Sequence, residues 1–381
     1  MDILNYTEKH KAFRESFRDF AEVEITPFAD TWENDQIVPR KVWWKMGQAG
    51  FLGTAVPKEY GGHGLDFLYS VILIEEMART NQTGLMPSLH SDIIVPYITS
   101  YGSEEIKQKY LAKTVDGSMI TAVAMTEPDA GSDLVSMKTT AVDSGDTVIL
   151  NGSKTFISNG INCDLVVVAA KDPEETDPYQ SLSLYLVEDG TPGFEKGKQI
   201  EKMGMHGQDT AELFFNNCII PKGNLLGNKG GGFIMLMEKL QQERLVCSIG
   251  AVAGAQFALD YITGYCKNTY SGSGKPLSKH QATKFALVEM STEVKIGRTF
   301  VDKLIFEHTN GENVVVETSM AKYWTTDLLQ RIISRSLDLT EEYGISEDCI
   351  LARAFRDARI LSIFAGTNEI MKEICSKFMG L

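Results

Sequence analysis

The chain has 381 residues, of which 43% are hydrophobic and 23% charged, so it is long enough for two or three compact units of ordinary globular composition. Its 51 acidic and 37 basic residues give a net charge of −14, which argues against a nucleic-acid partner because such proteins present a dense Lys and Arg surface. The six cysteines form no metal-ligand spacing, and neither a signal-peptide pattern nor a long uncharged apolar run is present, so we expect reduced thiols, no metal site, no membrane partner and a cytoplasmic location.

The first part of the chain has helical periodicity. Aromatic and apolar residues recur at helical spacing over residues 8–28, and comparable patterns follow over residues 38–50, 67–79 and 104–115. A glycine-rich loop at residues 60–64 interrupts them. These patterns predict an N-terminal helical domain over residues 1–118.

The hydrophobic pattern changes from residue 119 onward to short apolar runs. The runs at residues 165–170 and 181–187 alternate with turns rich in Asp, Gly and Asn, which is typical of strands. Helical periodicity returns after three consecutive glycines, Gly230 to Gly232, and lasts to the end of the chain. We therefore predict an α+β fold with a β domain over residues 119–230 and a C-terminal helical bundle over residues 231–381.

Three segments stand out chemically. Residues 125–133 (MTEPDAGSD) place a Glu-Pro turn before Ala-Gly-Ser, which brings backbone amides and small hydroxyls close together, as the approach to a flat polar ring requires. Residues 151–160 (NGSKTFISNG) lead from an Asn-Gly turn into a strand that carries an aromatic residue and a hydroxyl two positions apart. Residues 356–370 contain Arg-Asp-Ala-Arg and then Phe-Ala-Gly-Thr-Asn-Glu-Ile. Each segment alone is a weak signal.

Together, in this order and in an α-β-α chain, these segments resemble the acyl-CoA dehydrogenase family over nearly the whole sequence. The resemblance extends to residues 56–62, to the turn at residues 202–204 and to Gly232-Phe233 at the start of a long helix. It implies an N-terminal helical domain, a central β-barrel or sandwich and a C-terminal four-helix bundle. It also implies FAD-dependent α,β-dehydrogenation of an acyl thioester, with a proton leaving the α-carbon and a hydride passing from the β-carbon to flavin N5.

The resemblance also assigns residues to the cofactor. Those expected around the isoalloxazine ring are Met125, Thr126, Ser132, Phe156 and Ser158, and those expected at the FAD tail are Gln281 and Thr367. Amides and hydroxyls at the ring stabilise the negative charge of reduced flavin.

The catalytic base is the most informative position. An α-proton of a thioester is weakly acidic, so its removal needs a carboxylate held close and partly desolvated. Many relatives carry this Glu directly before the Gly-Thr turn, where this chain has Ala365, whose side chain cannot act as a base. Relatives resembling the isovaleryl and long-chain enzymes carry it on the long helix directly before an Arg, which matches Glu243-Arg244. We therefore expect Glu243 to be the base; the alternative is a surface or ion-paired helix carboxylate.

Three further roles follow from the resemblance. The backbone N–H of Ala365 is expected to polarise the thioester carbonyl, since alanine keeps that donor. Arg244 and Asp92 are expected to bind substrate, and Asp92 is also a candidate second acid or base. The alternative for Asp92 is a capping or surface role, and His90 is expected to be a pocket-wall or core histidine.

The segments expected to hold the FAD tail depart from the family. Tyr270 and Ser273 stand where relatives have Arg and Phe, and Asp338, Glu341 and Glu342 replace a Gln and two glycines. Glycines permit close approach to a pyrophosphate, whereas carboxylates repel it by roughly 1 kcal/mol per charge at about 4 Å in water. Either the tail is held differently, FAD binds weakly, or the protein has given up flavin.

Three functions stay open on sequence alone. The first is an acyl-thioester dehydrogenase or oxidase with Glu243 as base. The others are a non-redox lyase, isomerase or hydratase on the same fold, and a non-catalytic subunit paired with an active relative. For the first we expect an acyl-CoA or acyl-carrier-protein substrate, electron-transfer flavoprotein or oxygen as acceptor, and a homotetramer or homodimer. Residues 205–210 differ from those of relatives near the thioester end of the substrate, so both CoA and a carrier protein stay possible as the carrier of the acyl group.

Overall fold

Six α-helices form the N-terminal part of the computed structural model, which describes residues 3–381. They are α1 (Glu8–Glu24), α2 (Ala29–Asp35), α3 (Arg40–Gln48), α4 (Phe67–Arg79), α5 (Val95–Tyr101) and α6 (Glu104–Val115), and a π-helical turn, η3 (Leu89–Ile94), precedes α5. The predictions over residues 67–79 and 104–115 are confirmed to the residue. The helix predicted over residues 8–28 ends earlier, at Glu24, because Pro27 lacks a backbone N–H and disfavours a helical conformation at the residue before it.

Helix α4 forms one wall of the site described below. Its N-terminus is capped by Asp66, whose carboxylate accepts a hydrogen bond from the Leu68 N–H at 3.0 Å. Residues 69–77 are all buried, because α4 packs against α1 on one side and α7 on another. A helix that is covered all round holds the residues it presents to a cavity in fixed positions.

The central part is one mixed sheet of eight strands. They are β1 (Thr121–Ala124), β2 (Thr140–Ser144), β3 (Thr147–Ser158), β4 (Leu165–Lys171), β5 (Leu182–Glu188), β6 (Phe194–Gln199), β7 (Thr210–Pro221) and β8 (Leu225–Leu226). The order is β6-β7-β3-β2-β4-β5-β8, with β1 parallel to β4. Strand β4 is covered on both faces, since Val167 packs towards α5 and α6 while Val166 and Val168 pack within the β domain. This explains the continuous apolar run in its sequence.

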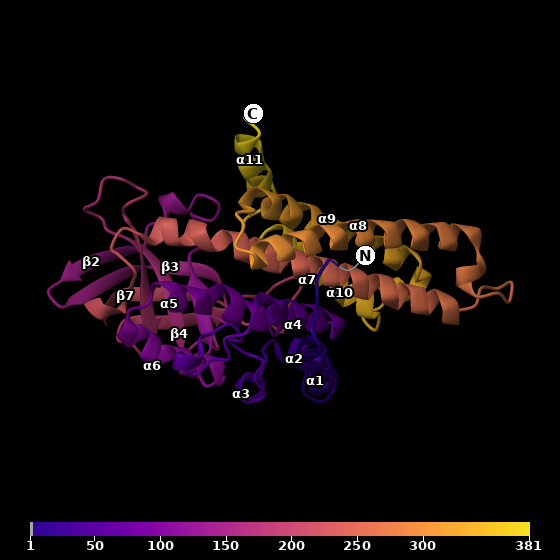
Figure 1. Cartoon of the computed structure of the whole chain (residues 1–381), viewed down its shortest axis with the longest axis horizontal. Helices are drawn as coiled ribbons and strands as arrows, with labels where there is room; N and C mark the ends of the chain where they lie inside the picture. The colour runs from indigo at the N-terminus through magenta and orange to yellow at the C-terminus, as the bar shows by residue number, and fades with distance from the viewer. Residues whose placement is uncertain (1–2) are drawn as a thin grey trace.

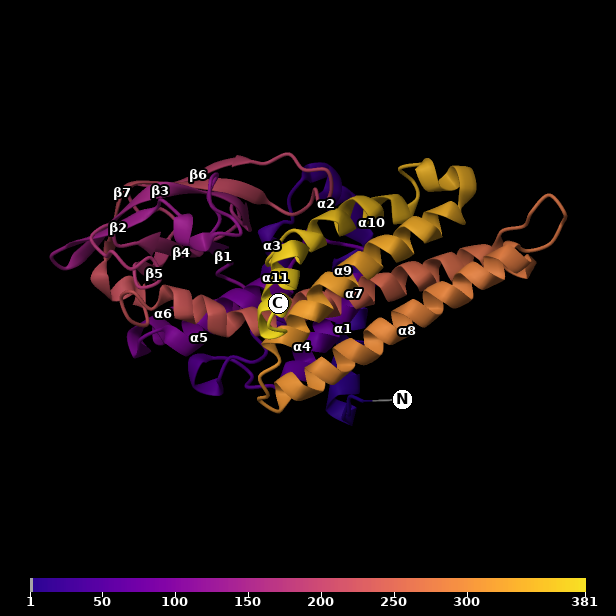
Figure 2. The same cartoon turned by 90° about the horizontal axis from the view of Figure 1, so that it is seen from above.

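The C-terminal part consists of α7 (Gly232–Asn268), α8 (Gln281–Thr309), α9 (Val315–Asp338), α10 (Ile350–Ala358) and α11 (Asn368–Phe378). Figures 1 and 2 show α7 running from beside the sheet to the far end of the bundle. Helices α7 to α10 share one core, to which each contributes apolar residues such as Ala258, Met290, Leu328 and Leu351. The predicted four-helix bundle therefore consists of three long helices and the short α10, and α11 packs on α9.

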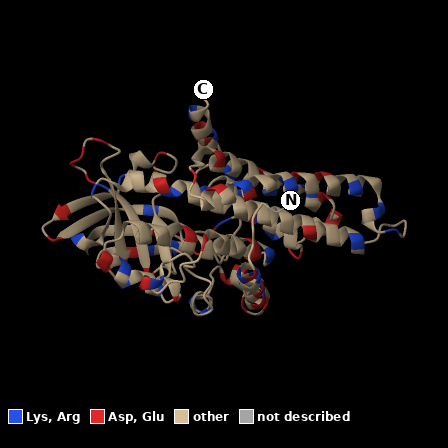
Figure 3. Cartoon of the chain, viewed as in Figure 1, with Lys and Arg blue, Asp and Glu red and all other residues tan. Residues whose placement is uncertain are grey.

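Two features of the bundle concern charge and hydropathy. Helix α7 is long and apolar enough to cross a membrane by composition alone, but 67% of its most apolar stretch is buried inside the protein, as in a core helix. Acidic and basic residues are interspersed along α8 and α9 (Figure 3). Among them, Arg335 on α9 pairs with Glu293 on α8 at 3.1 Å.

Candidate active site

A cavity of about 330 Å³ lies where the helical parts meet the sheet. Its walls come from α4, η3, β1, β3, α7, α9, α10 and the segment that precedes α11. Seven of the residues selected from the sequence line it together: Asp92, Met125, Thr126, Phe156, Ser158, Glu243 and Ala365. The structure therefore brings together the predicted base, four of the five predicted ring contacts and the residue predicted to polarise the carbonyl.

A β-bulge in β3 presents Phe156 to this cavity. The pairing of β3 with β7 shifts register between Lys154 and Ile157, and Phe156 within the shift has a left-handed φ of 57°. A bulge bends a strand and re-aims its side chains, and left-handed backbone is uncommon outside glycine. As a result Lys154 is fully buried, while Phe156 is 64% exposed and lines the cavity. The bulge thus offers a flat aromatic face that the rest of the chain leaves uncovered.

The buried Lys154 ties this strand to the loop after β1. Its Nζ donates to the Met125 carbonyl at 3.0 Å and to Glu127 Oε1 at 2.8 Å. Burial lowers the pKa of Lys154 to about 8, although Glu127 opposes this. Burial alone raises the pKa of Glu127, but hydrogen bonds from Lys154 and from the Thr139 and Lys138 segment outweigh it and lower the pKa overall. The ionised pair fixes Met125 and Thr126 against β3.

Glu243 lies on α7 and is only 4% exposed. The Tyr97 hydroxyl on α5 donates to its Oε1 at 2.9 Å. Burial raises the pKa of the Glu243 carboxyl, and the Tyr97 hydrogen bond and the nearby Arg244 charge only partly offset that effect. A partly desolvated carboxylate in a cavity has the environment of a general base. The alternative that Glu243 is a surface helix carboxylate is therefore wrong.

Arg244, the next residue, points elsewhere because successive helical side chains diverge by about 100°. Its guanidinium donates to the Ser319 hydroxyl on α9 at 3.1 Å, and Arg244 is absent from the cavity lining within residues 3–381. Burial lowers its pKa. The cavity therefore gives no support to the predicted substrate contact of Arg244, which stays a prediction.

Ala365 belongs to a tight turn between η8 (Arg359–Ser362) and α11. Its φ is 51°, also left-handed, and within residues 3–381 its N–H has no intramolecular hydrogen-bond partner. The turn is held by Lys322 of α9, a fully buried residue whose Nζ donates to the Gly366 carbonyl at 2.6 Å and to Asn368 Oδ1 at 3.2 Å. The arrangement leaves one backbone donor free at the cavity and fixes its direction.

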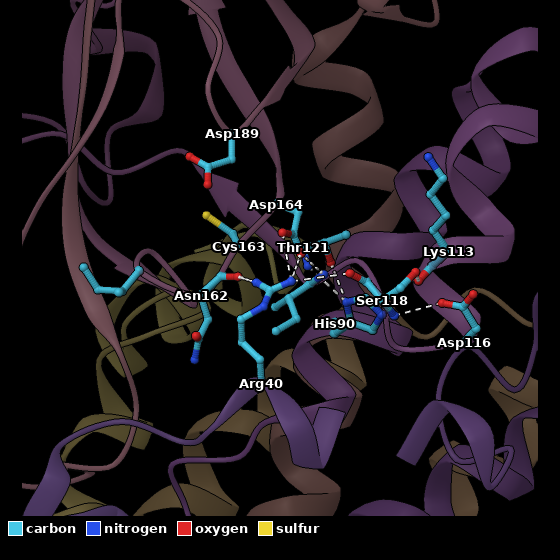
Figure 4. A network of polar contacts seen from close by, with 12 residues as sticks. Arg40, His90, Lys113, Asp116, Ser118, Thr121, Asn162, Cys163, Asp164 and Asp189 are labelled. Carbon is cyan, nitrogen blue, oxygen red and sulfur yellow. Dashed lines mark hydrogen bonds and ion pairs between the residues drawn. The ribbon is translucent and has the colours of Figure 1, made fainter. Parts of the chain in front are cut away.

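Asp92 lies on the π-helical turn η3, which is fastened to β1 through His90 (Figure 4). The His90 Nε2–H donates to the Thr114 carbonyl at 2.9 Å, and Nδ1 accepts from the Thr121 N–H at 3.2 Å and lies 2.8 Å from its hydroxyl. Burial lowers the pKa of His90 to about 4, so the ring is neutral. His90 is absent from the cavity lining that the described residues form, and the prediction of a core histidine is confirmed. A capping or surface role for Asp92 is wrong, because it is 5% exposed and lines the cavity.

The remaining predicted cofactor residues lie outside the cavity. Ser132 and Gln281 are exposed, and the Thr367 hydroxyl caps α11 by accepting from the Ile370 N–H at 3.2 Å. The divergent tail positions are also at the surface: Tyr270 is 65% exposed, and Asp338, Glu341 and Glu342 are exposed near the end of α9. The cofactor contacts of Ser132, Gln281 and Thr367 stay predictions.

Several functional contacts escaped the sequence analysis. Tyr97 and Lys322 act through contacts with residues far away in the chain, so no local pattern marks them. Glu127 and Lys154 stand in the two segments that the sequence singled out, but nothing in either segment indicates that they pair. Asp357 stands in the Arg-Asp-Ala-Arg segment that the sequence did single out. It lines the cavity and accepts hydrogen bonds from the Thr83 hydroxyl at 2.6 Å and from the Met205 N–H. These two bonds connect α10 to the segments that contain Thr83 and Met205.

Comparison with known proteins agrees with this architecture. Residues 7–118, 122–218 and 230–380 match the N-terminal, middle and C-terminal domains of acyl-CoA dehydrogenase. The chain is 40% identical to the long-chain specific acyl-CoA dehydrogenase of Rattus norvegicus over 98% of its own length and 86% of that protein, and 34% identical to an acyl-CoA dehydrogenase of Bacillus subtilis over 99% of each. The crystal structure of an acyl-CoA dehydrogenase from Geobacillus kaustophilus superposes with a TM-score of 0.97 at 48% identity, covering 99% of both chains. This chain therefore belongs to the acyl-CoA dehydrogenase family.

Proposed function

We propose that the protein is a flavin-dependent dehydrogenase of acyl thioesters in which Glu243 removes the α-proton. One observation carries the assignment: the buried Glu243 carboxyl shares a cavity with the predicted ring contacts and with the unpaired Ala365 N–H. A surface carboxylate or a salt-bridged one would not combine these features. The family relationship supports the same class of reaction, an oxidation at a CH–CH bond.

The cavity residues fit the ring of a flavin. Phe156 offers an exposed aromatic face for stacking, and Thr126 and Ser158 bring hydroxyl groups to the same edge of the sheet. The Lys154–Glu127 pair holds the Met125 loop in place before any ligand binds. Bound there, FAD supplies an acceptor for the hydride that leaves the substrate β-carbon.

The protein's own part is to take the proton and to stabilise the charge that this creates. Burial raises the pKa of Glu243, which makes its carboxylate a stronger base than an exposed one, and the Tyr97 hydroxyl orients it. Loss of the α-proton builds negative charge on the thioester oxygen. Ala365 lines the cavity and its N–H has no partner within residues 3–381, so this N–H is the donor that can stabilise the charge.

Glu243→Gln tests the assignment. The amide keeps the size and can still accept from Tyr97, so we expect normal flavin content but no bleaching of flavin absorbance on adding acyl-CoA. Glu238→Gln on the same helix is the matched control, since Glu238 is exposed, and it should bleach at the wild-type rate. Full bleaching by Glu243→Gln would move the base elsewhere, and a colourless protein that takes up no flavin would exclude the redox reaction.

The finer assignments are proposals of the same kind. We infer that the flavin is FAD although the tail positions Tyr270, Ser273, Asp338, Glu341 and Glu342 diverge, because four of the five predicted ring contacts line one cavity and the family relationship supports a flavin enzyme. We further infer a homotetramer or homodimer in the cytoplasm, with a CoA or carrier-protein thioester as substrate and electron-transfer flavoprotein or oxygen as acceptor. Chromatography of the released flavin, light scattering, and turnover with each acceptor and each tether test these assignments separately.

A further inference from the structure

Asp92 presents an unused hydrogen-bonding atom to the cavity. The Ser70 hydroxyl on α4 donates to its Oδ1 at 2.5 Å. The other carboxyl oxygen has no hydrogen-bond or ion-pair partner anywhere in residues 3–381, although the residue is only 5% exposed and lines the cavity. The Gln242 side chain contacts only the backbone carbonyl of Asp92, at 2.6 Å. The oxygen without a partner is left to the cavity, so a ligand bound there can pair with it by supplying a hydrogen-bond donor.

The other acids of the cavity already have a role. Asp357 accepts with both carboxyl oxygens, from the Thr83 hydroxyl and from the Met205 N–H, and Glu243, which accepts from Tyr97 with Oε1, is the proposed base. The described residues that line the cavity include no Lys, Arg or His, so nothing there neutralises Asp92. The rest of the lining is mainly apolar, with α4 and α7 contributing Leu73, Ile74, Met77 and Val246 among others.

These surroundings discriminate between acyl groups. A plain hydrocarbon chain would cover the free oxygen of Asp92 without giving it a hydrogen bond. A chain that ends in a carboxylate would be repelled by Asp92, Glu243 and Asp357, with no basic side chain in the lining to offset the repulsion. A hydroxyl substituent would pair with Asp92 in either protonation state, because a hydroxyl both donates and accepts. An amine or ammonium group would pair with the ionised form.

We propose that the protein acts on acyl thioesters whose acyl group carries a hydrogen-bond donor, a hydroxyl or an amine, and that Asp92 recognises this substituent. The inference rests on the proposed function, since it assumes that the acyl group occupies this cavity. Asp92 is a specificity determinant in it and takes no part in proton abstraction.

The test is calorimetric binding to the full-length, flavin-loaded Glu243→Gln protein, in which turnover is blocked. The probes are CoA thioesters of one chain length that are unsubstituted, hydroxylated or amino-substituted at successive carbons, or terminated by a carboxylate. We expect at least one hydroxylated or amino-substituted probe to bind on the order of 10-fold more tightly than its unsubstituted partner, and the carboxylate to bind worst. Adding Asp92→Leu should reverse the first preference.

Asp92→Asn separates recognition from folding. It retains the acceptor for Ser70 and can pair with a hydroxyl, so it should keep the hydroxyl preference and lose the amine preference. The ratio of the dissociation constants of two ligands, measured on the same protein, does not change when part of the protein is unfolded. Equal ratios with and without the Asp92→Leu substitution, or tighter binding of the unsubstituted chain at every position, would overturn the proposal. Failure to bind any acyl-CoA would instead overturn the proposed function, and this inference with it.

Discussion

The hydrogen bond from Tyr97 to Glu243 makes a quantitative prediction about pH. In Tyr97→Phe the Glu243 carboxylate loses its donor, while burial, the main cause of its raised pKa, is unchanged. A hydrogen bond to a charged group is worth about 1.5–3 kcal/mol, and 1.36 kcal/mol corresponds to one pKa unit, so the pKa should rise by roughly 1–2 units. Glu243 is only 4% exposed, so water compensates little.

The base must be ionised to act, so activity is lost as the pH falls through this pKa. The acid limb of kcat/KM, which reports the free enzyme, should therefore move to higher pH by roughly 1–2 units, with a plateau close to that of the wild type. Stopped-flow flavin reduction across pH measures it. Tyr101→Phe is the control, because that hydroxyl contacts the exposed Glu238 and not the base. An acid limb of Tyr97→Phe that coincides with the wild type would show that Glu243 does not abstract the proton.

Three further expectations concern stability and the turn. Lys322→Met removes the donor of the Gly366 carbonyl, so it should destabilise by about 1–3 kcal/mol in urea unfolding and slow flavin reduction more than the stability loss explains. Gly47→Ala would place a Cβ 2.1 Å from the backbone carbonyl carbon of Asp116, which should lower the free energy of unfolding by at least about 1–3 kcal/mol. In Gly264→Ala on α7 the added Cβ meets no neighbouring atom within 4 Å, so the free energy of unfolding should rise by roughly 0.5–1 kcal/mol. Burial raises the pKa of Asp92 from 3.8 to about 7, so its protonated form favours the fold below pH 4 and that contribution is lost as the pH rises through 7. Asp92→Asn should accordingly be more stable than wild type by roughly 2–4 kcal/mol at pH 8, with the difference vanishing near pH 4; equal melting curves at pH 8 would contradict this.

Local signals in the sequence were sufficient where structure is local. Periodicity defined α4 and α6 to the residue, and the resemblance motifs selected Met125, Phe156 and Glu243, which do line one cavity. The reason is that these motifs form turns and a β-bulge, whose backbone conformation depends mainly on the residue types of a few adjacent positions.

What could not be predicted depends on contacts between distant parts of the chain. Tyr97 reaches Glu243 across 146 positions and Lys322 reaches Gly366 across 44, so neither pairing has a sequence signature. The same limit applies to Arg244, since adjacency to Glu243 in sequence says nothing about which side of α7 faces the cavity. The direction of a helix face is set by what packs on it.

The two groups that we propose handle the thioester, the Glu243 carboxylate and the Ala365 N–H, occupy separate elements, α7 and the turn at Ala365. A residue that supplied both from the turn would have to satisfy two geometric demands at once, so any change there would alter acidity and carbonyl binding together. Here the demands are uncoupled. A substitution in the turn can alter how the thioester carbonyl is bound without moving the Glu243 carboxylate on α7. Carbonyl binding and proton removal can therefore change independently in the evolution of this chain.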